Sequence, residues 1–316
     1  MPPAKISVIL PTLNEVENLR EVYRRIQAAI LSTGLDYEII FVDDNSVDGS
    51  VELLKEMHND DPKVKYIIMS RRFGDQNCLM AGLKNATGDA VVTMDSDLQH
   101  PPEDITRMIK QWKNGIQIVI MKRETEGHNS RFKKYTEILF YKTMSWLSSS
   151  PIIYRFAGYS LFDRKVVTVL NLYSEYDPFL RGLIPLVGFS QVCLSYHEAP
   201  RAHGSTKYGL KQLFRLAISG MTSFSLKPLY FSFYLGSLAI IISMAFMLYV
   251  MISYFFTKAD IPPGWASTIL IVIFLGGTQL LSLGIIGIYI GKIFIQVKSR
   301  PNYIIAQSGG IREERD

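Results

Sequence analysis

The sequence has little of several features that mark common classes of protein. It contains two cysteines among 316 residues, Cys78 and Cys193, which give neither a disulfide framework nor a metal-ligand spacing. Both fit a reducing cytosol, where core packing is their expected role. The amino terminus has no cationic stretch followed by an apolar one, so we expect no secretory signal. The motifs GxxxxGKS/T and GxGxxG are both missing, which excludes a P-loop and a dinucleotide-binding turn.

Charge is almost missing from one long part of the chain. Residues 229–256 and 266–294 contain a single charged side chain, Lys292. Each segment exceeds the roughly 20 apolar residues that cross a bilayer as a helix. Only TKADIPPGW separates them, which predicts a tight transmembrane hairpin. A hairpin buried in a soluble core is the alternative, and two segments of this length argue against it.

Basic residues flank this hairpin on one side. They are Arg201, Lys207, Lys211, Arg215 and Lys227 before the first span, and Lys298, Arg300, Arg312 and Arg315 after the second. The connecting loop offers Lys258 alone. The positive-inside rule therefore predicts a multi-pass protein of the inner or plasma membrane, with both termini and the amino-terminal part of the chain cytoplasmic. Residues 206–228 mix basic and apolar side chains at helical spacing, which predicts an amphipathic segment at the membrane interface or packed on the soluble domain.

The first 125 residues alternate between strand-like and helix-like segments. Strands are predicted at 5–11, 37–44, 64–70, 89–95 and 116–122, and helices at 15–31, 48–59, 75–86 and 102–113. Strands that are apolar on both faces and alternate with helices predict an α/β fold with a parallel sheet between helices. Further along, helices are expected near 131–148 and 163–173, and VGFSQVCLSYHEAP is expected to form one or two strands.

Three polar clusters follow predicted strands. PTLNE (11–15) follows the first strand, VDDNSVDGS (42–50) ends the second, and DSD (95–97) ends the fourth. Ligands bind outside the carboxyl ends of the strands in an open parallel sheet. Helix capping would explain one acidic strand end, but three at one edge favour a binding site.

The DSD cluster suits a hard divalent cation. Asp95 and Asp97 would repel each other unless a positive charge lay between them. Mg²⁺ prefers a few carboxylates together with phosphate oxygens and water. A nucleotide diphosphate would supply those oxygens, and the metal would offset its charge as a leaving group. Without a P-loop, we expect Asp44 and its neighbours to bind the nucleotide through ribose hydroxyls or base nitrogens.

The sequence resembles glycosyltransferase family 2. The segments that carry the resemblance are SVILPTLNE, IIFVDDNSVDGS, RRFGDQNCLMAGLKNATGDAVVTMDSDLQHPPEDI and RAHGSTKYG. The similarity is strongest to polyisoprenyl-phosphate glycosyltransferases, the group of bactoprenol glucosyltransferases and dolichol-phosphate mannose synthases, and it covers nearly the whole chain. It implies a Rossmann-like, GT-A type catalytic domain at 1–205, the interfacial segment at 206–228, two transmembrane helices within 229–295, and a cytoplasmic tail at 296–316.

The resemblance also implies roles for single residues. Those expected at the nucleotide are Pro11, Leu13, Glu15 and Asp44. Asp95 and Asp97, with Ser96 between them, are expected to hold Mg²⁺ or Mn²⁺ with the diphosphate. Arg123 is expected near the sugar or phosphates, and Arg201 and Lys207 at the phosphates. For the last two, attraction to an anionic membrane surface is the alternative.

One segment departs from the family pattern. Relatives read approximately AGDFRLMDR where this chain has AGYSLFDR (157–164), without the acidic residue that is often proposed as the catalytic base. A phosphate monoester, with a second pKa of about 6, is already largely dianionic at neutral pH. Positioning and leaving-group stabilisation would then supply most of the catalysis. Asp177 in EYDPFL is a second candidate base, and helix capping is its other interpretation.

The activity that the resemblance implies is inverting transfer of one sugar from a nucleotide diphosphate to polyprenyl (undecaprenyl) phosphate, with UDP-glucose as the favoured donor. A processive polysaccharide synthase is an alternative, because QLFRL (212–216) is one residue from QxxRW, although two spans are too few for a translocation channel. A membrane scaffold that binds nucleotide sugars without turnover is another. No nucleic acid partner is expected, and a homo-oligomer is left open.

Overall fold

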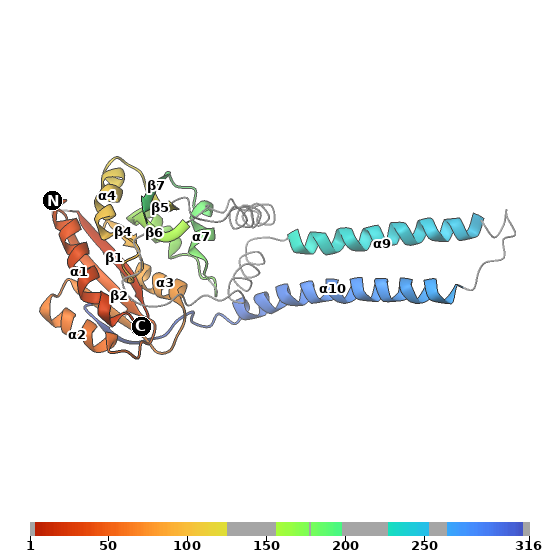
Figure 1. Ribbon diagram of the computed structural model, residues 1–316, viewed down its shortest axis with the longest axis horizontal. Helices are drawn as coiled ribbons and strands as arrows, with labels where there is room; N and C mark the ends of the chain where they lie inside the picture. Colours follow the sequence, from red (N-terminus) through yellow and green to blue (C-terminus); the bar gives the residue numbers. More distant parts are fainter. Residues whose placement is uncertain (1–3, 125–155, 177, 198–226, 253–263, 312–316) are drawn as a thin grey trace. The chain divides into compact units, whose positions relative to one another are not determined.

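The computed structural model describes residues 4–124, 156–176, 178–197, 227–252 and 264–311 (Figure 1). In chain order the elements are β1 (Lys5–Thr12), α1 (Val16–Leu31), β2 (Asp36–Asp43), α2 (Ser50–Asp60), β3 (Val64–Met69), α3 (Asp75–Asn85), β4 (Ala90–Thr93), η1 (Pro102–Asp104), α4 (Ile105–Lys113), β5 (Ile118–Glu124), β6 (Phe156–Asp163), α6 (Arg164–Leu170), α7 (Leu180–Leu183), η2 (Ile184–Leu186), β7 (Gln191–His197), α9 (Lys227–Ile252), α10 (Trp265–Val297) and β8 (Ile305–Gly309).

The chain divides into two compact units. The sheet unit consists of Met1–Lys142, Ser150–Leu210 and Arg300–Asp316. The helical unit consists of Thr143–Ser149 and Lys211–Ser299. The chain therefore leaves the sheet unit, forms α9 and α10, and then returns to add β8.

The sheet unit is built on an eight-stranded sheet in the order β7-β5-β6-β4-β1-β2-β3-β8. Strands β4, β1, β2 and β3 are parallel, as the alternation of strands and helices predicts. However, β6 runs antiparallel to both β4 and β5, and β8 runs antiparallel to β3. The sheet is therefore mixed, and the prediction of a parallel sheet is wrong at these two strands.

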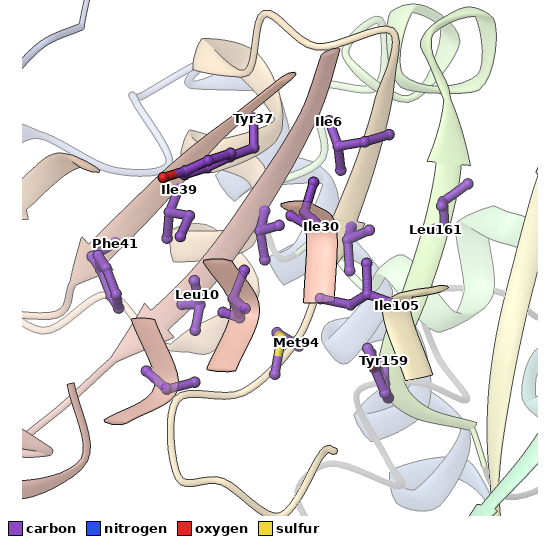
Figure 2. Packing of buried hydrophobic residues seen from close by; sticks show 14 of the residues in the cluster. Ile6, Leu10, Ile30, Tyr37, Ile39, Phe41, Met94, Ile105, Tyr159 and Leu161 are labelled. Atoms are coloured by element: carbon purple, nitrogen blue, oxygen red, sulfur yellow. The ribbon is translucent and has the colours of Figure 1, made fainter. Parts of the chain in front are cut away.

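Helices cover both faces of this sheet. Helix α1 buries Leu19, Val22, Ile26 and Ile30, which are spaced three or four residues apart and therefore share one side of the helix. Together with apolar residues of α2 and α4 they form one cluster with the strands, and Figure 2 shows its packing around Leu10, Phe41 and Met94. Helices α3 and α6 contact β1, β2, β4 and β6 through the remaining buried residues. Each fully buried Leu or Ile contributes roughly 1.5–3 kcal/mol.

The predicted elements are found with small shifts in their bounds. The five predicted strands correspond to β1–β5, and the four helices between them to α1–α3 and to η1 with α4. VGFSQVCLSYHEAP contains one strand, β7, and the helix expected at 163–173 is α6. The helix expected near 131–148 lies outside the described residues, as does most of the predicted interfacial segment.

The helical unit contains α9 and α10, which pack against each other. Many of their large apolar side chains are exposed, including Phe231, Phe233, Ile241, Phe274, Leu280 and Phe294. Among the described residues, one segment, the 24 residues Phe274–Val297, is long and apolar enough to cross a membrane, and Leu229–Ala239 is a shorter apolar helix. The two-span hairpin stays a prediction.

Candidate functional site

Three loops meet at the carboxyl ends of β1, β2 and β4. The register pairs Thr12 with Asp43 and Ile9 with Thr93, so the residues that follow these strands lie at one edge of the sheet. These are the loops that carry PTLNE, VDDNSVDGS and DSD. The edge predicted to hold the site is therefore the edge at which these polar clusters converge.

The first two loops are joined by four hydrogen bonds. Asn14 donates its backbone N–H to Ser46 Oγ (2.8 Å) and accepts from the N–H of Val47 through Oδ1 (3.0 Å). Asp48 accepts from the N–H of Val16 at the start of α1 (3.0 Å), and Ser50 Oγ accepts from the N–H of Glu15 (3.3 Å). Asn14 and Asn45 have positive φ angles of 54° and 62°, which Asn tolerates better than most residues. This network fixes the backbone around Leu13 and Glu15.

Two buried carboxylates end β2. Asp44 is 5% exposed, and its two oxygens accept the backbone N–H groups of Phe73 (2.6 Å) and Gly74 (3.0 Å) at the start of α3. Asp43 is fully buried, with Oδ1 accepting from the N–H of Ser46 (2.8 Å). Its Oδ2 has no hydrogen-bond partner among the described residues. Burial raises the pKa of Asp43, and the nearby charges of Asp48 and Asp44 act in the same direction.

The DSD loop is held by side chains of its own and by β1. Ser96 donates its hydroxyl to the carbonyl of Pro11 (3.0 Å), which ties the loop to the end of β1. Asp97 is 6% exposed and accepts the N–H of Gln99 through Oδ1 (3.1 Å). The side chain of Asp95 is 55% exposed. One carboxylate is thus fixed within the protein and the other faces solvent.

The donor set fits a divalent cation that also binds a phosphate-containing ligand. Among the described residues no group of three or more His, Cys, Asp or Glu side chains could hold a metal alone. Asp95 and Asp97 supply hard carboxylate oxygens, which suit Mg²⁺ or Mn²⁺. Mg²⁺ is usually held by one or two carboxylates together with substrate phosphates and water, and this site offers that number.

Some of the other predicted residues lie on β5 or outside the described residues. Arg123 is exposed near the end of β5, where the register pairs it with Tyr196 of β7. Asp177, Arg201 and Lys207 lie outside the described residues. Pro11 lies near the end of β1, and Leu13, Glu15, Asp44 and Ser96 lie in the three converging loops.

The segment AGYSLFDR forms most of β6, next to β4. Gly158 has a φ of 86° and accepts the hydroxyl of Thr93 through its carbonyl (2.9 Å). Tyr159 is fully buried and donates its hydroxyl to the carbonyl of Pro101 (2.8 Å). Ser160 is also fully buried. The segment therefore contacts Thr93 before the DSD loop and Pro101 after it, and it presents neither of these hydroxyls to solvent.

Sequence reasoning did not find His100, which is 3% exposed and accepts the backbone N–H of Asp95 through Nδ1 (3.1 Å). Its only sequence signal is its place three residues after Asp97, before two prolines. It also missed Asn14 and Ser46, whose polarity is visible in the motifs but whose partners lie some 30 residues away.

The chain is similar in sequence to known proteins. The family model for glycosyl transferase family 2 matches residues 7–170. The chain is 40% identical over 309 residues to an uncharacterized glycosyltransferase, YkcC, of Bacillus subtilis, covering 98% of this chain and 95% of the relative. It is 34% identical over 304 residues to the bactoprenol glucosyl transferase of Shigella phage SfII, covering 96% and 98%.

A solved structure is also similar. It is the glucosyl-3-phosphoglycerate synthase from Mycobacterium tuberculosis in complex with Mn²⁺, UDP and phosphoglyceric acid, with 22% identity and a TM-score of 0.46. The similarity covers 69% of this chain and 76% of that chain.

Proposed function

The chain belongs to glycosyltransferase family 2, and from this premise we propose that it transfers one glucose unit from UDP-glucose to polyprenyl phosphate at a membrane surface, with inversion. The observation that carries this proposal is the similarity to bactoprenol glucosyl transferases, which extends over 96% of the chain. It therefore includes α9 and α10 as well as the sheet unit. The name of these relatives gives both glucosyl transfer and bactoprenol, which are the transfer and the acceptor of the proposal.

The proposed donor site is formed by the loops after β1 and β2. Asp44 would meet the nucleoside, because its carboxylate offers about four lone pairs and three donors use one each, the N–H groups of Phe73 and Gly74 and the thiol of Cys78. Pro11, Leu13 and Glu15 line the adjacent strand end, which the hydrogen bonds between the first two loops hold in place. The backbone would thus be organised before the nucleotide binds, which lowers the entropic cost of binding.

The proposed metal ligands are Asp95 and Asp97. A bound Mg²⁺ or Mn²⁺ would neutralise charge that develops on the leaving diphosphate. The half-exposed Asp95 is accessible to such an ion, while buried Asp97 is held by the N–H of Gln99. Ser96 keeps both carboxylates at the end of β1 through Pro11. Arg123 is proposed to meet the sugar or phosphates from β5.

The acceptor chemistry explains how the altered β6 segment is tolerated. Tyr159 and Ser160 are buried, so neither is accessible as a general base. A polyprenyl phosphate is already largely deprotonated at neutral pH, because its second pKa is about 6. Its oxygen would attack the anomeric carbon directly while the diphosphate departs, so positioning by the protein is the main requirement. Asp177 is retained as a second candidate base.

The proposed membrane attachment is the helical hairpin of α9 and α10. Their exposed apolar side chains would be costly in water and stable among lipid tails. Both termini and the sheet unit are proposed to be cytoplasmic. Arg201 and Lys207 are proposed to meet the phosphates. A polyprenyl chain would lie in the same bilayer that holds the helices.

A transfer assay tests this function. The full chain in liposomes would receive UDP-glucose, Mg²⁺ or Mn²⁺, and polyprenyl phosphate, and the lipid products would be analysed by mass spectrometry. We expect one hexose on the lipid and no product after the metal is chelated. A polymeric product would instead indicate a processive synthase, and nucleotide-sugar binding without transfer from any donor would indicate a scaffold.

Asp97→Asn tests the proposed metal site within that assay. Removing one charge-stabilising group from an active site typically costs on the order of 10²–10³-fold in rate, so we expect at least a 10²-fold loss of transfer. Asp60→Asn is the matched control, because Asp60 is exposed at the end of α2. Full activity of Asp97→Asn would contradict the assignment.

A further inference from the structure

The loop from Asp95 to His100 is closed on itself by hydrogen bonds. His100 Nδ1 accepts the backbone N–H of Asp95 (3.1 Å), and Asp97 Oδ1 accepts the N–H of Gln99 (3.1 Å). Leu98 lies between them with a φ of 62°, a left-handed conformation that is uncommon for a side chain of this kind. The backbone of this loop is therefore held in a conformation that it would rarely adopt alone.

The ring of His100 is fixed from two other strands. It stacks on Tyr159 of β6, with centroids 5.0 Å apart and planes at 13°, and meets Tyr196 of β7 edge to face at 5.6 Å. Tyr159 and Tyr196 also pack edge to face, at 5.8 Å. Tyr159 in turn donates its hydroxyl to the carbonyl of Pro101, next to His100 (2.8 Å). These contacts restrict the orientation of the His100 ring.

That orientation directs both ring nitrogens at one residue. Because Nδ1 accepts a hydrogen bond, it carries no hydrogen, and the hydrogen of the neutral ring is on Nε2. Nε2 lies 3.8 Å from Oδ2 of Asp95. His100 therefore contacts the backbone of Asp95 and faces its carboxylate.

We propose that His100 is a positioning residue for the metal site. It holds the backbone of Asp95 through Nδ1 and thereby directs the half-exposed carboxylate of Asp95 toward the cation that carries the diphosphate. The proposal rests on the proposed function, because it assigns His100 a role toward that metal. It also gives the altered β6 segment a role, since Tyr159 of AGYSLFDR supports the His100 ring.

Two substitutions separate the hydrogen bond from the packing. His100→Phe keeps an aromatic ring between Tyr159 and Tyr196 but removes the acceptor for the N–H of Asp95. His100→Asn does the reverse. The Oδ1 of Asn is bonded to Cγ, as Nδ1 is in His, so it can accept the same hydrogen bond, but the aromatic ring is lost. A purely structural role and a positioning role therefore predict opposite orders for the two variants.

The measurement is UDP binding by the full chain in detergent, by isothermal titration calorimetry with and without Mn²⁺, together with the melting temperature. Without this hydrogen bond the half-exposed Asp95 is no longer held by His100, so His100→Phe is expected to bind UDP about tenfold more weakly in Mn²⁺. Its UDP binding without metal should equal that of the wild type, with little change in melting temperature. His100→Asn should retain most of the Mn²⁺-dependent affinity while melting at a lower temperature.

Wild-type affinity of His100→Phe for UDP in Mn²⁺ would overturn the proposal. The proposal would also be overturned if His100→Asn bound UDP more weakly than His100→Phe in Mn²⁺, in the same order as their melting temperatures. His100 would then be a packing residue. If the wild type binds UDP equally with and without Mn²⁺, the metal site of the proposed function fails and this proposal fails with it. The first two outcomes leave the proposed function intact.

Discussion

Glu38 is a carboxylate buried at the amino-terminal end of the sheet, away from the candidate site. Its side chain is 1% exposed and lies 2.8 Å from the ammonium groups of both Lys5 and Lys65. It also accepts hydrogen bonds from the hydroxyl of Ser7 and from the N–H and hydroxyl of Thr87. A buried charge is tolerated only when it is paired and hydrogen-bonded in this way.

This pairing makes the stability of the sheet unit depend on pH. Burial by itself would raise the pKa of Glu38, but the hydrogen bonds from Lys5 and Lys65, with those from Ser7 and Thr87, outweigh it and lower the pKa to about 2. Relative to an ordinary value of 4.5, this corresponds to about 3 kcal/mol. Because the folded-state pKa is lowered, the contribution is complete above pH 4.5 and is lost as the pH falls toward 2.

We therefore expect Glu38→Gln to lower the free energy of unfolding by about 3 kcal/mol at pH 7, with the difference from wild type shrinking between pH 4.5 and 2. Chemical unfolding of the full chain in detergent across that range measures it. Glu56→Gln is the matched control, since Glu56 and its partner Arg20 are both more than half exposed and such pairs contribute little. A constant difference at all pH values would show that charge is not the cause.

The positions of single site residues were predictable from the sequence where a carboxylate directly follows a predicted strand. Asp44, Asp95 and Asp97 follow apolar runs, so their place at the sheet edge follows from the alternation of strands and helices. His100 and Glu38 were not predictable, because their roles depend on partners that are far away in the sequence. Tyr159 is 59 positions from His100, and Thr87 is 49 positions from Glu38.

At the scale of elements, strand β8 is the part of the fold that differs most from expectation. It forms the edge of the sheet beside β3, and the N–H of Ser70 donates to the carbonyl of Ile304 just before it (2.9 Å). Asn302 donates through Nδ2 to the carbonyl of Glu175 (2.6 Å). The returning chain is thus joined to two loops of the sheet unit before it enters the sheet.

Gly309 of β8 pairs with Tyr66 of β3 and packs closely against its ring. A Cβ at this position would overlap Cε1 of Tyr66, whose ring packs edge to face on His58 at 5.6 Å. We expect Gly309→Ala to lower the free energy of unfolding by about 1–3 kcal/mol, the usual cost of overpacking. Thermal unfolding of the full chain measures the change.

A double-mutant cycle provides the control. In a Tyr66→Leu background the ring is gone, so Gly309→Ala should cost much less than it does in the wild type. An equal cost in both backgrounds would mean that the glycine is needed for another reason. The prediction would then be wrong.

The sequence predicts strands β1–β5 because each is a run of apolar residues between predicted helices. Such runs are typical of strands that are buried on both faces of a sheet. Strand β8 (IAQSG) is short and mostly exposed, contains Gln307 and Ser308, and pairs with a strand more than 200 residues earlier. Edge strands of this kind have little alternation of apolar and polar residues, so the sequence around β8 predicts a tail and no strand. Strand β6 was not predicted for a different reason. AGYSLFDR was compared with the family motif and not assessed as a strand, and its antiparallel direction depends on pairing with β4 and β5.

At the scale of the whole molecule, the sheet unit is not continuous in sequence. Some of its residues precede α9 and α10 in the sequence and others follow them, and its last strand, β8, is among those that follow. A chain that ends at Leu210 would therefore lack β8 and expose the unpaired backbone of β3. Exposed edges of this kind promote aggregation, and the loops that contact Asn302 and Ile304 would lose these bonds.

We predict that a shortened chain of residues 1–210 melts at a lower temperature and aggregates more than the same chain with residues 300–316 attached through a flexible linker. The eight strands span about 34 Å from β7 to β8, at about 4.8 Å per strand pair. A Gly/Ser linker of about 30 residues has an average end-to-end distance of about 30 Å and can reach. Melting temperature and light scattering measure the effect, and the same linker carrying a scrambled 300–316 segment is the control. If residues 1–210 alone are as stable as the linked chain, β8 contributes nothing to the sheet unit. Rescue by the natural segment alone would show that the chain after α10 completes the fold of the sheet unit.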